Sequence, residues 1–186
     1  ATSRGKFTRC TPKIPVSGAL CIMESLRRVD SMEFKIDDLT DSKIAEFLED
    51  HISDMKSVSP PESKHALDLE GLRMPDVTFW SAWEKEELVG CGALKELDSS
   101  HAEIKSMRVS TKLRGQGIAS KLLTYILGEA ASKGYRTVSL ETGAMSFFEP
   151  ARKLYEKFGF QYCAPFGSYI EDPNSMFMSL EIAENA

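Results

Sequence analysis

The stretch from Glu103 to Leu127 constrains this chain more than any other part of its sequence. Residues 103–109 are typical of a β-strand, and residues 118–130 carry apolar side chains at helical spacing. The polar loop between them contains Gly115 and Gly117, which allow a tight turn and a close approach to a ligand. The helix then offers unpaired N–H groups and the positive end of its dipole. This arrangement predicts a phosphate or pyrophosphate site, although Gly-x-Gly alone is equally typical of an ordinary loop.

Composition narrows the class of protein. At 186 residues, the chain is long enough for one domain with a full core. Its 42% hydrophobic and 27% charged content is typical of a globular protein, and no apolar run is long enough to span a membrane. A net charge of −5 argues against nucleic-acid binding. The four cysteines are widely spaced, which implies no metal site and favours reduced thiols in a cytoplasmic protein.

The first 31 residues differ in charge from the rest. They carry six Lys or Arg residues against two acidic ones. A targeting peptide or regulatory arm is one interpretation. We favour the simpler one, an extension outside the fold, with the domain spanning residues 32–186.

The order of the expected elements predicts an α/β fold. Hydrophobic patterning and turn residues indicate strands at 33–36, 77–83, 88–94, 103–109, 135–142, 160–166 and 175–182, and helices at about 41–58, 67–72, 118–133 and 149–158. Three consecutive hairpin connections make the central strands antiparallel. The strand–helix–strand unit then makes the fourth and fifth strands parallel by a right-handed crossover. The last two strands are expected to form a hairpin closed through Pro173 and Asn174.

Two motifs carry a resemblance to a known family. Arg114-x-x-Gly117-x-Ala119 lacks the Gly-Lys-Ser/Thr of a P-loop and the third glycine of a dinucleotide-binding loop. It resembles the acetyl-CoA pyrophosphate loop of the GNAT N-acetyltransferase superfamily. Ala151-x-x-Leu154-Tyr155-Glu156-Lys157-x-Gly159-Phe160 is similar to a second landmark of that family. The similarity covers residues 33–182, and the sequence looks like a branch of small bacterial GNAT proteins.

The resemblance implies where acetyl-CoA would bind. In the family, a mostly antiparallel mixed sheet is flanked by helices, and the parallel fourth and fifth strands splay apart to admit the pantetheine arm. Its amides would pair with the backbone of Met107, Arg108 and Val109. The pyrophosphate would meet N–H groups of the loop residues, which are Arg114, Gly115, Gln116, Gly117, Ile118, Ala119 and Ser120. No metal is implied.

The resemblance also implies catalytic roles in direct transfer of acetyl to an amine. Tyr155 would give a proton to the departing sulfur, unless it only packs in the core. Glu103 would be the base, unless it is a solvated carboxylate at a strand end. Glu141 is the competing carboxylate, and a bulge in the strand would change which face Glu103 shares with Met107.

The acceptor is left open between a small-molecule amine and a protein amine. Glu62, in a net acidic stretch, would attract a cationic amine unless that stretch is a solvated loop. Trp80 would stack on the acceptor unless it is a core aromatic, and Glu141 is a third candidate contact. Many relatives are dimers, so the resemblance allows a homodimer. Phe148 departs from the family, which often has a cofactor-contacting Asn there.

Two rival functions are compatible with the sequence. A non-catalytic acyl-CoA-binding module that regulates a partner would keep the loop at 114–120 but would need no Tyr155. An O-acyl transferase on the same scaffold is the other.

Overall fold

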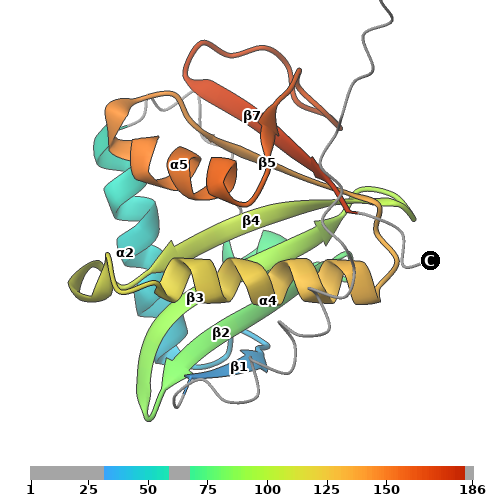
Figure 1. Ribbon diagram of the computed structural model, residues 1–186. Coiled ribbons are helices and arrows are strands. Elements are labelled where there is room, and N and C mark those ends of the chain that lie inside the picture. Colours follow the sequence, from blue (N-terminus) through green and yellow to red (C-terminus); the bar gives the residue numbers. More distant parts are fainter. Residues whose placement is uncertain (1–31, 59–67, 183–186) are drawn as a thin grey trace, which may run out of the picture. The chain divides into compact units, whose positions relative to one another are not determined.

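The computed structural model describes residues 32–58 and 68–182, which belong to one compact unit (Figure 1). The predicted extension at 1–31 lies outside the described residues. The strands are β1 Met32–Ile36, β2 Val77–Glu84, β3 Glu87–Glu96, β4 His101–Val109, β5 Thr137–Gly143, β6 Gln161–Tyr162 and β7 Ser175–Glu181. The α-helices are α2 Ser42–Val58, α3 Leu69–Leu72, α4 Ile118–Ser132 and α5 Glu149–Lys157. Short 3₁₀ helices η2 Thr111–Leu113 and η3 Ser146–Phe148 precede α4 and α5.

The described strands form one mixed sheet in the order β1-β2-β3-β4-β5-β7-β6. All neighbouring strands are antiparallel except β4 and β5, which are parallel, as the sequence predicted. Within the described ranges, no helix is long and apolar enough to span a membrane.

The end of the chain differs from the expected simple hairpin. β7 lies between β5 and β6, and β6 has two residues rather than the seven expected. Cys163 N still donates to Phe177 O, but Pro165 has no N–H to continue the ladder, and Gly167 has a φ of 58°. The chain therefore leaves the sheet after Cys163 and returns only at Ser175.

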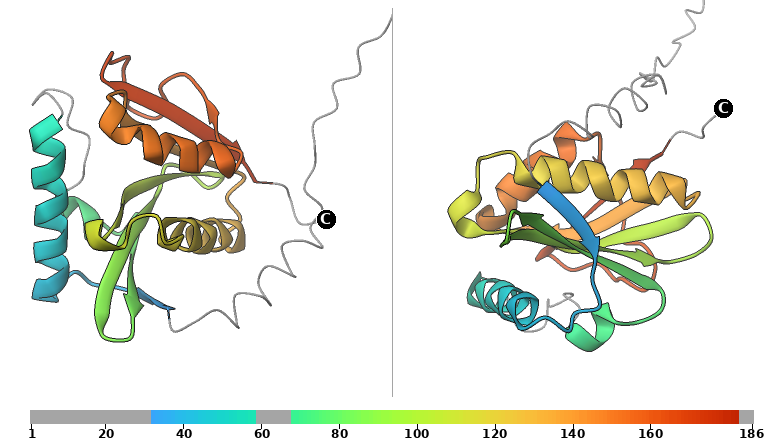
Figure 2. Two further views of the ribbon diagram at one scale, coloured as in Figure 1. Left: turned by 60° about the vertical axis from the view of Figure 1, so that its left-hand side comes forward. Right: turned by 90° about the horizontal axis from the view of Figure 1, so that it is seen from below.

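Apolar side chains cover both faces of the sheet, because residues alternate between the faces of a strand. Trp80 points to the face covered by α4 and α5, whereas Phe79 points to the face covered by α2 and α3. The right-hand view of Figure 2 shows α4 and α2 on opposite sides. The buried α4 stripe consists of Ile118, Leu122, Leu123, Ile126 and Ala130. Each buried leucine or isoleucine contributes about 1.5–3 kcal/mol to stability, so the stripe fixes α4 on the sheet.

β4 contains a bulge and extends beyond its pairing with β5. Arg108 pairs with Cys91 and Lys105 with Ala93, so two β4 residues lie opposite Gly92. One of them, Ser106, has a φ of 50°. The parallel pairing ends at Ile104 with Leu140, although β4 continues to Val109. The two strands therefore part after residue 104, which is the divergence that the resemblance implied. We call this place the β4–β5 opening.

Candidate active site

The loop before α4 has the backbone of an anion site. Gly115 and Gly117 both have a φ of 81°, a conformation that side chains with a Cβ rarely adopt. Gly117 is the N-cap of α4, and no side chain caps this end of the helix. The carbonyl of Gly117 accepts the hydrogen bond from Lys121 N, so the N–H groups of the first turn have no intrahelical partner. A Cβ built on Gly117 meets no atom of the described residues within 4 Å. The loop therefore offers open space beside free donors at the positive end of a helix.

The end of β4 lies beside the β4–β5 opening, and η2 connects it to the loop before α4. Met107 and Val109 pack against the core on the α4 face. Arg108 points to the other face, where its guanidinium lies 5.2 Å from the ring centre of Phe47. Because these side chains point to the two faces of the sheet, the edge of β4 that borders the β4–β5 opening consists of backbone N–H and C=O groups.

Tyr155 lies on α5, next to the opening. Only 7% of its surface is exposed, and its ring packs edge-on against Phe160 at 5.6 Å. Its hydroxyl lies 3.8 Å from Met107 Sδ, a weak acceptor. Burial raises the pKa of Tyr155 above the usual value for tyrosine. The hydroxyl therefore keeps its proton at neutral pH and can donate it beside β4.

Glu103 lies on the opposite face of β4 from Met107. Without the bulge, positions 103 and 107 would share a face; the extra residue at Ser106 separates them. Glu103 is 3% exposed, so it is not the solvated strand-end carboxylate that the sequence left open. Its Oε1 accepts hydrogen bonds from Lys105 Nζ at 3.0 Å and from the Tyr169 hydroxyl at 2.6 Å.

Glu141 joins Glu103 on this face. Its partner on β7 is Phe177, whose ring contacts that of Tyr169 at 5.3 Å. The Ser175 hydroxyl donates to Glu141 Oε1 at 2.7 Å. The negative charges of Glu103 and Glu141 both help to raise the pKa of Tyr169, after burial, which is the main cause. The two candidate carboxylates therefore flank one tyrosine.

Sequence reasoning missed Lys105 and Tyr169. The signal for Lys105 was available, because residues two apart in a strand share a face and Glu103 was already a candidate. Tyr169 lies 66 residues after Glu103 in a segment without periodicity, so no sequence pattern indicated this contact.

Comparison with known proteins identifies the family. A model described as the Acetyltransferase (GNAT) family matches residues 44–160. The uncharacterised N-acetyltransferase YsnE of Bacillus subtilis (strain 168) is 58% identical over 151 residues, which are 81% of this chain and 100% of YsnE. The chain belongs to the GNAT acetyltransferase family. The uncharacterised N-acetyltransferase YedL of Escherichia coli (strain K12) is 48% identical over 151 residues, covering 81% of this chain and 95% of YedL. The resemblance to a bacterial GNAT branch is confirmed, and the protein is an N-acetyltransferase by family.

A solved GNAT structure has the same fold. The crystal structure of a GNAT family acetyltransferase from Elizabethkingia anophelis with acetyl-CoA bound aligns with a TM-score of 0.56. It is 18% identical and covers 83% of this chain and 100% of that one. GNAT structural neighbours thus bind acetyl-CoA. The residues of this chain fit such a ligand, because the open space at Gly117 is where a phosphate would meet the free N–H groups.

Trp80 is not brought to the β4–β5 opening. Trp80 is fully buried on the α4 face, with its ring edge against Tyr125 at 6.1 Å. This burial favours the alternative interpretation, a core aromatic, over contact with an acceptor. Glu62 falls outside the described residues. In the part of the chain that the structure describes, no group of three or more His, Cys, Asp and Glu residues could hold a metal ion.

Phe148, the departure from the GNAT pattern, packs against the end of β5. A Cβ on Gly143 would overlap its ring. Arg152 Nη1 donates to the carbonyls of Gly143 and Met145, so it ties α5 to the connection from β5. At position 148 this chain therefore has an apolar contact with β5, directly before α5 begins at Glu149.

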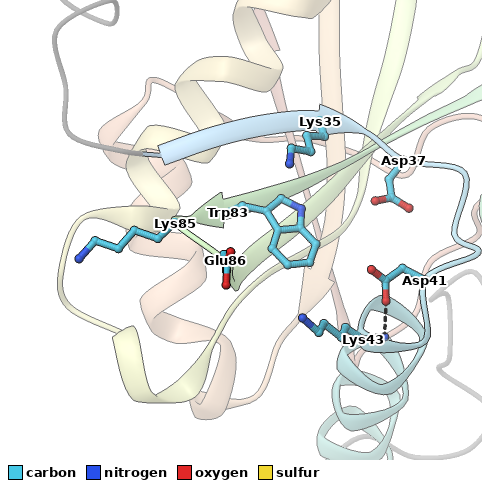
Figure 3. A pocket seen from close by; sticks show the side chains of 7 residues that line it. All are labelled: Lys35, Asp37, Asp41, Lys43, Trp83, Lys85 and Glu86. Atoms are coloured by element: carbon cyan, nitrogen blue, oxygen red, sulfur yellow. Dashed lines mark hydrogen bonds between the residues drawn. The ribbon is translucent and has the colours of Figure 1, made fainter.

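A concavity of about 430 Å³ lies at the β1–β2 edge of the sheet, away from the β4–β5 opening (Figure 3). Trp83 lies between Lys35 and Lys43, whose Nζ atoms are 5.6 and 5.8 Å from its ring centre. The full lining is Lys35, Asp37, Asp41, Lys43, Trp83, Lys85 and Glu86. Its charges balance, and none of these residues comes from β4, β5 or α5.

Proposed function

We propose that the protein moves acetyl from acetyl-CoA to a primary amine by direct transfer within a ternary complex. Acetyl-CoA supplies an activated acetyl thioester. The observation that carries the proposal is the β4–β5 opening, which has a protonated tyrosine on one face and a paired carboxylate on the other.

The loop residues Arg114 to Ser120 would hold the pyrophosphate, and the backbone of Met107 to Val109 would hold the pantetheine arm. Both assignments come from the resemblance to the family, and a backbone geometry that favours contacts with a ligand supports them. The open Gly117 gives phosphate access to N–H groups, and β4 has no parallel partner beyond Ile104. Binding through backbone groups orients the thioester without a dedicated side chain.

In the proposed reaction, a C–N bond forms between the amine and the acetyl carbon while the C–S bond breaks. The sulfur takes a proton from the Tyr155 hydroxyl and leaves as the thiol. The ammonium form of the acceptor first loses a proton to Glu103, directly or through a water, and Glu103 later releases it to solvent. After the C–N bond forms, the nitrogen loses a second proton, which restores the Tyr155 hydroxyl. An amine with a free pKa near 10 is mostly protonated at neutral pH, so a nearby base is needed. Glu141 is the alternative base, because it lies on the same face.

The charges around Glu103 do not distinguish a small-molecule amine from a protein amine. Glu103 and Glu141 favour a cation on the face of the sheet that they share, whereas Lys105 and Arg108 on β4 add positive charge to that face. A small-molecule amine and a protein lysine both meet these conditions.

The test is release of free CoA over a panel of small amines and lysine peptides, with the mass of each product measured. We expect at least one amine to gain the mass of one acetyl group as thiol appears. Binding of acetyl-CoA without thiol release for any acceptor would support the rival binding module. An acetylated hydroxyl would instead support the O-acyl transferase.

We also propose that residues 1–31 lie outside the acetyltransferase domain. A variant without them should bind acetyl-CoA with unchanged affinity in a calorimeter, because the first strand begins at Met32. Its thermal unfolding transition should match that of the full chain. Loss of acetyl-CoA binding would make the extension part of the domain.

A further inference from the structure

We infer that Tyr169 is a positioning residue that holds Glu103 ready to accept a proton. The inference rests on the proposed function, in which Glu103 is the base. It adds a residue from the connection between β6 and β7, which carries none of the sites inferred from the sequence.

Glu103, Lys105 and Tyr169 are joined to one another by three hydrogen bonds. The Tyr169 hydroxyl donates to Glu103 Oε1 at 2.6 Å and accepts from Lys105 Nζ at 2.6 Å. Lys105 Nζ also donates to the same Oε1 at 3.0 Å. Glu103 and Lys105 are only 3% and 8% exposed, so water screens these contacts little.

One oxygen of the Glu103 carboxylate remains available to accept a proton. Both hydrogen bonds that the described residues make with Glu103 end on Oε1. Oε2 is therefore the oxygen that can receive a proton from an amine or a water. Fixing Oε1 from two directions fixes the orientation of Oε2, as a base requires.

Tyr169 is directed inward by its own segment. Its N–H donates to Phe166 O at 3.0 Å across a turn that contains Gly167. Its ring packs against those of Phe166 and Phe177, at 5.2 and 5.3 Å. The next residue, Ile170, is 80% exposed. In this largely exposed connection, the turn and the aromatic contacts hold Tyr169 toward β4.

Several charged or titratable groups face this set of hydrogen bonds. Lys105 also lies 5.3 Å from the Tyr169 ring centre, and Glu141 approaches from β5. His101 on β4 shares a 2.7 Å hydrogen bond with the Ser139 hydroxyl and packs near Phe166. Burial and the two carboxylates raise the pKa of Tyr169, so it stays a neutral donor through the working pH range. A neutral hydroxyl can donate to the Glu103 carboxylate throughout that range.

Tyr169→Phe tests the inference, because it keeps the ring and removes the donor. Losing this hydrogen bond leaves the Glu103 carboxylate held by Lys105 alone among the two donors, so its second oxygen is less well oriented and kcat should fall about tenfold. Affinity for acetyl-CoA should not change. A residue that only packs would alter stability and leave kcat unchanged.

Tyr162→Phe is the matched control, since it also removes a tyrosine donor to a carboxylate. The Tyr162 hydroxyl donates to Glu156 Oε1 at 2.8 Å on the exposed surface. Its kcat should match that of the wild type. A Tyr169→Phe kcat that matches both, or a loss confined to acetyl-CoA affinity, would overturn the inference.

Glu103→Gln separates the failure of this inference from failure of the proposed function. If Glu103→Gln lowers kcat while Tyr169→Phe leaves it unchanged, only the role of Tyr169 is wrong. If Glu103→Gln leaves kcat unchanged, Glu103 is not the base, and the inference about Tyr169 falls with it. Absence of transfer by the wild-type protein to any amine would overturn both.

Discussion

Replacing Tyr155 with phenylalanine lowers kcat about 100-fold and leaves the affinity for acetyl-CoA nearly unchanged. A positioned general acid contributes about 10²–10⁴-fold, and a thiolate with a pKa near 8.5 is a fair leaving group, which favours the low end. The hydroxyl acts mainly in the transition state, so the change appears in kcat. Steady-state kinetics with the best amine, and calorimetry with acetyl-CoA, measure the two quantities separately.

The fold should tolerate this substitution. The Tyr155 hydroxyl contacts a thioether sulfur at 3.8 Å, so its loss should cost less than about 1 kcal/mol of stability. Tyr125→Phe is a suitable control, because Tyr125 packs on Phe34 at 4.4 Å, away from the β4–β5 opening. Its kcat should match the wild type. If single-turnover rates show that chemistry limits kcat and Tyr155→Phe still matches the wild type, Tyr155 is only a packing residue.

Gly117→Ala weakens acetyl-CoA binding about 10- to 100-fold, whereas Gly134→Ala leaves it unchanged. The two glycines flank the same helix, with φ of 81° and 84°, and a Cβ on either meets nothing within 4 Å. Both substitutions should therefore cost a similar 1–2 kcal/mol of stability, from the left-handed backbone. Only at Gly117 would the Cβ also occupy the space in which phosphate meets the N–H groups. Loss of one charge-assisted hydrogen bond accounts for the expected factor.

Thermal unfolding and calorimetry on the two variants measure both effects. Equal losses of stability with unequal losses of affinity would assign the open space at Gly117 to the ligand. Equal affinities would remove the loop from the acetyl-CoA site, whatever the stability of the variants.

The parts of this protein that could be predicted from sequence depend on local patterns. The α4 stripe follows the helical period, and the loop glycines lie directly before it, so both are present in one short window. The parallel pairing of β4 and β5 follows from the helix between them. The exposure of Trp80 could not be decided, because strands covered on both faces are apolar throughout.

The arrangement around Glu103 could not be predicted, because it depends on long-range contacts and on one irregular residue. The bulge at Ser106 reverses the face of Met107 relative to Glu103, and no local pattern locates it. Tyr169 reaches Glu103 only because β7 lies beside β5 and places Phe177 under its ring. Such contacts follow from the topology of the sheet.

The most direct test of the account is a crystal structure of the protein with CoA. We predict the pyrophosphate within hydrogen-bond distance of the N–H groups at the start of α4, and the pantetheine arm along β4 at residues 107–109. The sulfur should lie within reach of the Tyr155 hydroxyl. A CoA molecule held elsewhere, for example in the concavity beside Trp83, with the β4–β5 opening left without pantetheine, would contradict the account.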